Sequence, residues 1–218
     1  MENNKIKMLV YRVLMKTDNL QVNMENCIKF GLELLENSVE TENICILAGL
    51  DKKEYWDIKK YFENVLNELN IHINIFDKQL QKEYLLFTAN EVLNGNTSPI
   101  DAVKELTEYH VLYGYDIAYS TYYYLSEIID LLKEEEISYA NGMTKNNINE
   151  YIKQHFEYLL KMEKMGVPDE IYKQAYCKKC EKRVIPAFNI KCPKCGYYDF
   201  FWIIYNDGME LYLKEIEI

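Results

Sequence analysis

The sequence contains none of the short motifs that mark the commonest nucleotide-binding and hydrolase sites. Its eight glycines are isolated from one another, so GxGxxG, GxxxxGKS/T and GxSxG are all absent. No stretch approaches about eighteen uninterrupted apolar residues, and residues 1–5 lack the charged-then-apolar layout of a secretory signal. We therefore expect a soluble, cytoplasmic protein with no membrane partner.

Histidine is also scarce, and no two of the three histidines are expected to share a helix face, so a second metal site is not predicted. His110 has Tyr109, Tyr113 and Asp116 near it, but a hydrogen-bonded structural histidine is the favoured interpretation. The three acids at 134–136 are typical of a solvated helix end rather than of a general acid and base. No catalytic residue is predicted, and we expect that the chain is not an enzyme.

Basic residues are outnumbered by acidic residues over most of the chain. Residues 1–176 carry 18 Lys and Arg against 29 Asp and Glu, a net charge of −11. Between residues 177 and 195 the balance reverses, with six basic residues against one acidic residue. Because an acidic body repels phosphate and attracts basic surfaces, we expect a protein partner with a basic surface. Nucleic acid is the alternative partner for the basic segment alone, through Lys178, Lys179, Lys182 and Arg183.

Four of the six cysteines form two closely spaced pairs. Cys177 and Cys180 are followed by eleven residues and then by Cys192 and Cys195. Two such turns, joined by a segment that can return as a strand, supply four thiolates, the closed tetrahedral shell of one structural Zn2+. Gly196 suits the second turn because glycine adopts the positive φ that points amide groups at thiolate sulfur. Redox chemistry and an extracellular disulfide pair are the less favoured interpretations.

The segment resembles the zinc-ribbon family, whose cysteine turns commonly read CPxCG, as Cys192 to Gly196 does here. The resemblance covers roughly the last 42 residues and departs from the family pattern at Glu181, where glycine is usual. The residues predict three antiparallel strands, 183–188, 197–205 and 209–218, with a hairpin turn at Asn206-Asp207-Gly208. Such a small sheet buries too little apolar surface to be stable alone, so the metal is expected to stabilise it.

The rest of the chain is predicted to be helical, because apolar residues recur at helical spacing. Asn94-Gly95 is expected to end one helix and Ser98-Pro99 to begin the next, while Asp51 and Glu54 predict a capping box. The expected helices cover residues 5–15, for which a strand is the alternative, 23–35, 42–50, 51–69, 77–93, 99–113, 116–133 and 147–165.

The predicted fold class is mainly α: an irregular helical bundle, or a helical-repeat-like array, with a small C-terminal antiparallel β zinc ribbon. We expect an acidic α-helical domain over 1–170 and a zinc-ribbon domain over 171–218. Cys27 and Cys45, each among apolar neighbours, are predicted to be reduced core cysteines outside the metal site. The segment 42–50 is expected to be largely buried.

Tyrosine is unusually frequent, with twenty in the chain and seven between residues 109 and 124. On a helix, Tyr115, Tyr119 and Tyr122 share one face. They are either core residues whose hydroxyls reach the surface or a contact surface, because tyrosine is enriched at interface hot spots. The contact surface is the candidate partner-binding site, and it requires at least one of the three rings to be exposed.

The block 44–69 reads ILAGL, then a spaced YF, then LNEL, and is similar to small helical proteins that bacteria encode as immunity partners of toxins. The resemblance implies an immunity or inhibitor function against a basic partner, such as a nuclease toxin with a positive cleft. The leading hypothesis is therefore a non-enzymatic, protein-binding protein with one structural zinc ion. The alternative is a nucleic-acid-associated regulator that uses the lysine-rich tip of the ribbon.

Overall fold

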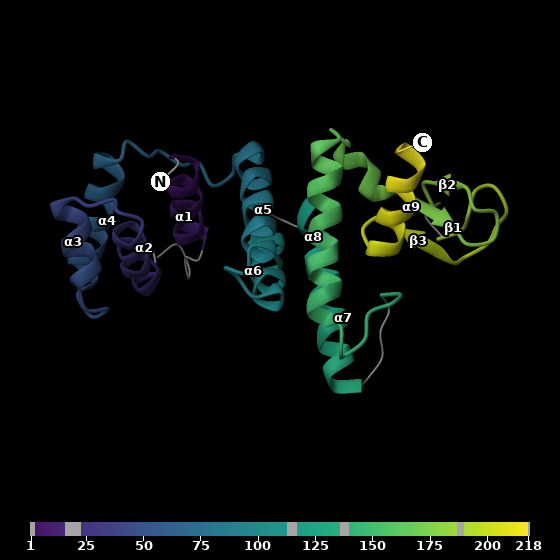
Figure 1. The fold of residues 1–218 in the computed structure, drawn as a ribbon, viewed down its shortest axis with the longest axis horizontal. Coiled ribbons are helices and arrows are strands. Elements are labelled where there is room, and N and C mark those ends of the chain that lie inside the picture. The colour runs from purple at the N-terminus through teal and green to yellow at the C-terminus, as the bar shows by residue number, and fades with distance from the viewer. Residues whose placement is uncertain (1–2, 16–22, 113–116, 136–139, 187–189, 218) are drawn as a thin grey trace. The chain divides into compact units, whose positions relative to one another are not determined.

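The computed structural model describes residues 3–15, 23–112, 117–135, 140–186 and 190–217. Over these ranges the chain is mainly helical, with a small three-stranded antiparallel sheet near the C-terminus, which confirms the predicted fold class (Figure 1). The chain forms two compact units that divide after Tyr84, within α5 (Lys78–Leu93). No helix in the described ranges is long and apolar enough to cross a bilayer.

The first unit contains α1 (Asn3–Met15), α2 (Met24–Glu36), α3 (Glu42–Gly49), α4 (Tyr55–Glu68) and the start of α5. Residues 5–15 are helical, so the strand alternative for this segment is wrong. Phe30 of α2 packs edge-on against Phe62 of α4, with ring centroids 5.8 Å apart. Gly31 lets α2 lie close to α3, because a Cβ at this position would be 3.1 Å from the backbone nitrogen of Ala48.

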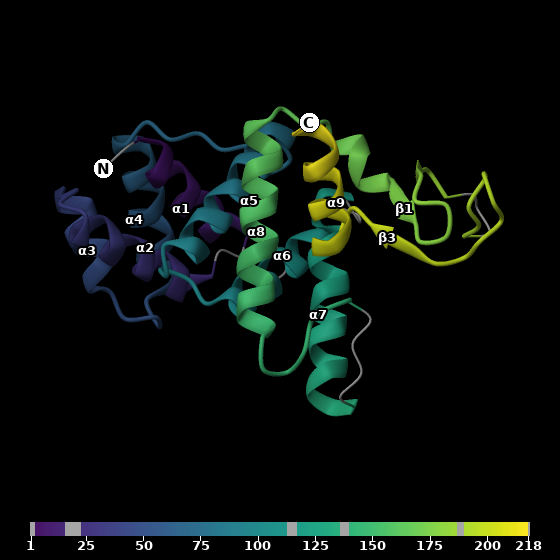
Figure 2. The same cartoon turned by 45° about the vertical axis from the view of Figure 1, so that its right-hand side comes forward.

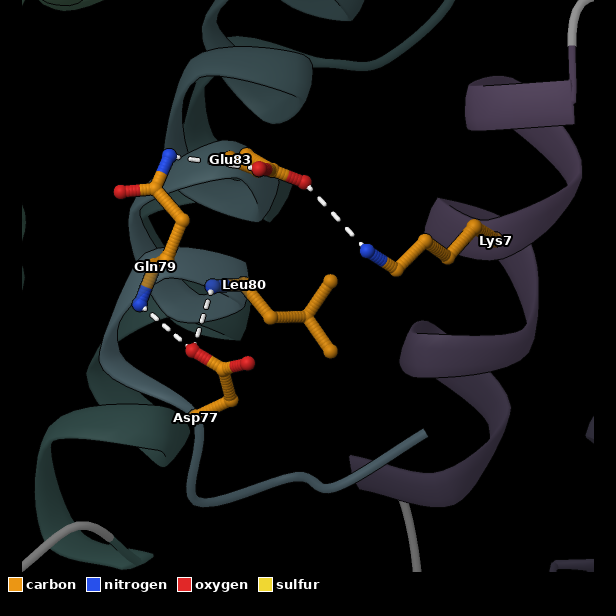
Figure 3. Close-up of polar contacts among 5 residues, drawn as sticks. All are labelled: Lys7, Asp77, Gln79, Leu80 and Glu83. Carbon is orange, nitrogen blue, oxygen red and sulfur yellow. Dashed lines mark hydrogen bonds and ion pairs between the residues drawn. The ribbon is translucent and has the colours of Figure 1, made fainter. Parts of the chain in front are cut away.

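The start of α5 is fixed by polar contacts that Figure 3 shows. The carboxylate of Asp77 accepts hydrogen bonds from the amides of Gln79 and Leu80, at 2.9 and 3.4 Å, and so satisfies donors that a helix start leaves unpaired. One turn further on, Glu83 pairs with Lys7 of α1 across 3.7 Å. The helix predicted over 77–93 therefore begins at Lys78, directly after Asp77.

The second unit continues from α5 through α6 (Pro99–Leu112), α7 (Ile117–Glu135), α8 (Ile148–Lys164) and a short 3-10 helix, η1 (Asp169–Lys173). Gly95 has a φ of +77°, and the amide of Asn96 donates to the carbonyl of Glu91, so α5 ends as Asn94-Gly95 predicted. Tyr122 of α7 stacks on Phe156 of α8, with ring centroids 5.7 Å apart.

The sheet of the second unit has the strand order β2-β1-β3 and is antiparallel throughout. Its strands are β1 (Ala175–Cys177), β2 (Arg183–Val184) and β3 (Phe200–Trp202). The last helix, α9 (Asn206–Ile216), packs against α8 on one side and against β1 and β3 on the other. In Figure 2, α9 lies between α8 and the sheet, and the cysteine-bearing loops extend away from the helices.

The expected strand over 209–218 is wrong, because Asn206–Ile216 is a helix. The apparent alternation of Leu211, Leu213 and Ile216 misled the prediction, whereas the buried residues Met209, Tyr212 and Leu213 recur at helical spacing. The expected hairpin turn at 206–208 is instead the first turn of this helix. A third strand exists, but it is β1, which ends at Cys177, the first cysteine of the first pair.

Two local predictions also need correction. Glu54 does accept from the amide of Asp51 at 2.7 Å, but Asp51 accepts from Lys53 within the turn, and α4 starts only at Tyr55. The expectation that residues 42–50 are largely buried is also wrong: only Ile44 and Leu47 are buried, and Cys45 is exposed, so it is not a core cysteine. An eight-residue helix packs one face on its neighbours and leaves the other in solvent, even when most of its residues are apolar.

The predicted division into domains 1–170 and 171–218 stays a prediction. The first compact unit ends at Tyr84 and the second begins at Leu85. The second unit contains α8, the sheet and α9. Because α9 contacts both α8 and the sheet, the C-terminal segment is packed onto the helices and not attached only through the linker at 168–174.

Candidate metal centre

The four paired cysteines converge at one end of the sheet. Their sulfur atoms all lie within 4.8 Å of one another, and all four thiols are free. The Sγ atoms of Cys177 and Cys195 are 3.5 Å apart, and those of Cys180 and Cys192 are 3.8 Å apart. A tetrahedral shell with Zn–S bonds of about 2.3 Å places its sulfurs about 3.8 Å apart. The cluster therefore fits a four-thiolate metal ion.

The two cysteine pairs sit in turns with the same hydrogen-bond pattern. In the first turn, the carbonyl of Cys177 accepts from the amide of Glu181 at 2.8 Å, and the amide of Cys177 donates to the carbonyl of Lys182. In the second, the carbonyl of Cys192 accepts from Gly196 at 2.9 Å, and its amide donates to Tyr197. The first turn thus keeps the geometry of the second.

Glu181 and Gly196 occupy the equivalent position of the two turns, and both have positive φ angles, +55° and +71°. Glycine takes this conformation without strain, as the sequence predicted for Gly196, whereas a residue with a Cβ pays about 1 kcal/mol. Replacement of the usual glycine by Glu181 therefore leaves the turn intact at the cost of local backbone strain.

Amide groups in the turns point at the cysteine sulfurs. Burial of the Cys177 thiol would raise its pKa, but hydrogen bonds from the amides of Cys180 and Lys179, with those of neighbouring thiols, lower the pKa to about 7. The amide of Tyr197 favours the thiolate of Cys195, yet burial and bonds to neighbouring thiols raise this pKa to about 12. Thiolate is the form that a metal binds, so the amides favour metal binding and the thiol protons must leave.

The cysteines are also part of the small core beside the sheet. The buried cluster there consists of Ala175, Cys177, Val184, Cys192 and Phe200, with Cys180 and Trp202 packed against it. Two of its five buried members are candidate ligands, and the three strands are only two or three residues long. So little apolar surface cannot by itself offset the entropy of ordering these loops.

The chain matches no protein-family model, no curated protein and no solved structure.

The structure divides the four basic residues that were predicted to contact nucleic acid into two groups. Lys178 pairs with Asp199 at 3.0 Å, and Arg183 pairs with Glu215 at 3.1 Å. Their charges are therefore partly neutralised within the chain. Lys179 and Lys182 are exposed and have no carboxylate partner among the described residues.

Two of the three tyrosines that were predicted to bind a partner lie in the core. Tyr119 and Tyr122 are each only 1% exposed, so the predicted contact surface is wrong for both. Tyr119 meets Tyr109 of α6 edge-on, and Tyr122 stacks on Phe156 of α8, because α6 packs along this face of α7 and Phe156 covers Tyr122. Tyr115 lies outside the described residues.

His155 is buried in a polar contact between α8 and α9. Its Nδ1 lies 3.1 Å from Oδ1 of Asn206, whose Nδ2 donates to the carbonyl of Tyr151 and to Oε1 of Gln154. Since Oδ1 of Asn206 is the acceptor, Nδ1 of His155 carries the proton. Burial lowers the pKa of His155 to about 4, against the smaller raising effect of its bond to Asn206. Both side chains thus have a structural role.

An acidic groove lies beside this contact and was not predicted from the sequence. It is a cavity of about 500 Å3 lined by α8, by Asn141, Gly142 and Asn147 before it, and by the start of α9. Four carboxylates line it, against a single cation, Lys153; they are Glu150, Glu157, Asp207 and Glu210. Burial raises the pKa of the Asp207 carboxyl above its usual value. The groove could have been found only if residues 206–216 had been recognised as a helix.

Proposed function

We propose that the chain is a non-enzymatic binding protein whose four-cysteine centre holds one structural zinc ion. Four thiolates complete a tetrahedral shell and leave no position for a substrate. Soft thiolate ligands in this geometry suit zinc, and iron is the main competitor. Two of the five buried core residues beside the sheet are candidate ligands, which supports a structural role for the metal. Metal–sulfur bonds would stabilise a core that has too few apolar contacts to be stable alone.

The partner that the charges favour is a protein with a basic surface. The observation that carries this proposal is the acidic groove, where Glu157 and Asp207 have no ion-pair partner among the described residues. Carboxylates on two packed helices form a fixed negative surface, which speeds association with a basic partner and selects against acidic ones. An immunity or inhibitor function against a basic toxin is the most specific form of the proposal.

The test is co-purification from the native cell with the zinc-loaded chain as bait. The variant Glu157→Gln/Glu210→Gln removes two charges from the groove, and Asp57→Asn/Glu63→Gln removes two charges from the exposed face of α4 as a matched control. We expect a basic protein to bind the wild type and the control, and its affinity for the groove variant to fall at least about tenfold.

Activity of the captured partner gives the second readout. If the partner is a nuclease toxin, the wild-type chain should inhibit its nuclease activity and the groove variant should inhibit it less. Equal capture by the groove variant and the control would contradict the role of the groove. Capture of acidic proteins alone would contradict the proposal as a whole.

A further inference from the structure

The outer face of the metal centre carries a patch of tyrosine and lysine side chains. We call it the knuckle surface and define it as Lys179, Lys191, Lys194, Tyr197 and Tyr198. Tyr198 is 61% exposed and Tyr197 41% exposed, although both are large aromatic residues. The ammonium of Lys179 lies 5.9 Å from the ring centre of Tyr197, and that of Lys191 lies 5.0 Å from that of Tyr198. The first distance links the two cysteine turns, and Lys194 lies within the second turn, between Cys192 and Cys195.

The charge of this patch is not neutralised by neighbouring side chains. Lys178 and Arg183 have carboxylate partners, whereas the three lysines of the knuckle surface have none among the described residues. Glu181 is the one exposed acid between the cysteine pairs. A zinc ion with four thiolates is a −2 centre that nearby lysines offset in part. Residues 177–199 contain six basic side chains against Glu181 and Asp199, so a positive surplus remains.

We propose that the knuckle surface binds single-stranded nucleic acid. Bases stack on the rings of Tyr197 and Tyr198, and phosphates contact Lys179, Lys191 and Lys194. Exposed aromatic rings beside cations are the combination that single strands require, because every base has a face that stacks and every nucleotide carries a negative charge. With no carboxylate holding them, the lysines are free to turn from the rings to the phosphates as the bases arrive.

Duplex DNA fits this surface less well. Groove readers insert a helix or a two-stranded ribbon. Here α9 packs between α8 and the sheet, and the strands are two or three residues long. An acidic protein would satisfy the lysines but has no need of two exposed tyrosine rings. The inference goes beyond the proposed function, because it concerns a different surface of opposite charge, and either one can fail alone.

The experiment measures fluorescence anisotropy of a labelled single-stranded 12-mer with the zinc-loaded full chain. We expect binding at 50 mM salt, and about 20-fold weaker binding at 200 mM salt if three phosphates are neutralised. Tyr197→Leu and Tyr198→Leu should each weaken binding about tenfold, with unchanged zinc content and circular dichroism. Tyr61→Leu is the matched control, because Lys60 lies 5.1 Å from the Tyr61 ring on α4, and it should bind like the wild type.

A second set of variants keeps the test decisive if the tyrosine variants lose zinc. Lys191→Gln/Lys194→Gln should flatten the salt dependence while zinc stays bound. Absence of binding at 50 mM salt would overturn the proposal. Binding of the duplex form of the same 12-mer with equal or higher affinity would also overturn the proposal. If poly-glutamate displaced the labelled strand as effectively as the unlabelled strand does, the ligand would be an acidic protein and the proposal would be wrong.

Discussion

Protonation of His155 should destabilise the second unit in mild acid. In the unfolded chain its pKa is near 6.5, and in the folded chain burial lowers it to about 4. The folded state therefore disfavours the charged imidazole. Stability is unaffected above pH 6.5 and is lost as the pH falls from 6.5 toward 4. The free energy of unfolding should fall by about 2 kcal/mol at pH 5 and by about 3 kcal/mol at pH 4.

The assay compares urea unfolding at pH 7.5, 6.5 and 5.0 for the wild type and for His155→Asn. The Asn amide can donate to Asn206 near the position of Nδ1 but does not titrate. Both chains carry Trp56→Phe, because Trp56 is exposed on α4 of the first unit, and the remaining Trp202 then reports the second unit alone. His155→Asn leaves a cavity and lowers stability at every pH, so the measured quantity is the change with pH.

Thiolate ligands also gain protons in acid, so both chains are measured with excess zinc and their metal content is checked at each pH. His72→Gln, on an exposed histidine, should keep the full pH dependence of the wild type. If His155→Asn loses as much stability between pH 7.5 and 5.0 as the wild type, burial of a neutral His155 is not what makes the fold sensitive to acid.

Two further outcomes are expected at the metal centre. Metal analysis should find one zinc ion per chain. The variant Cys192→Ser should lose this ion and the near-ultraviolet signal of Trp202, whereas the control Cys27→Ser should keep both. Zinc bound to Cys192→Ser at full stoichiometry would contradict the four-ligand site. In urea titrations of the zinc-loaded chain, Glu181→Gly should raise the free energy of unfolding by about 1 kcal/mol, and Gly196→Ala should lower it by about as much, because both positions have a positive φ. A change of the same sign in both variants would show that the positive φ does not determine their stability.

Most helices were predictable because their ends carry chemistry that is local in sequence. Asn94-Gly95 and Ser98-Pro99 mark the boundary between α5 and α6 within one or two residues. The convergence of the four cysteines was likewise predictable, since their spacing leaves few other arrangements. The positive φ of Glu181, which gives the first cysteine turn the geometry of the second, was not predictable from the sequence. A strained φ depends on what the surrounding fold imposes.

The errors arose where tertiary packing decided between patterns that look alike. Leu211 and Leu213 read as an alternating strand, yet α8 and the sheet cover one face of a helix at these residues. The sequence allows Tyr119 and Tyr122 to form either an exposed or a buried face. Only the packing of α6 on α7, with Phe156 of α8 on Tyr122, selects the buried one. The acidic groove is lined in part by α9, so it was not predicted once residues 209–218 were taken to be a strand.

Gly208 limits how this fold can diverge in evolution. A Cβ at this position would lie 2.1 Å from the carbonyl oxygen of Trp202 and 2.7 Å from the backbone nitrogen of Ile203. Both are main-chain atoms, so no choice of neighbouring side chains could make room for an alanine. Relatives can replace nearly every surface residue of α9, but they should keep a glycine at a fixed distance after Cys195. That glycine, read together with the four cysteines, should identify distant homologues better than overall similarity would.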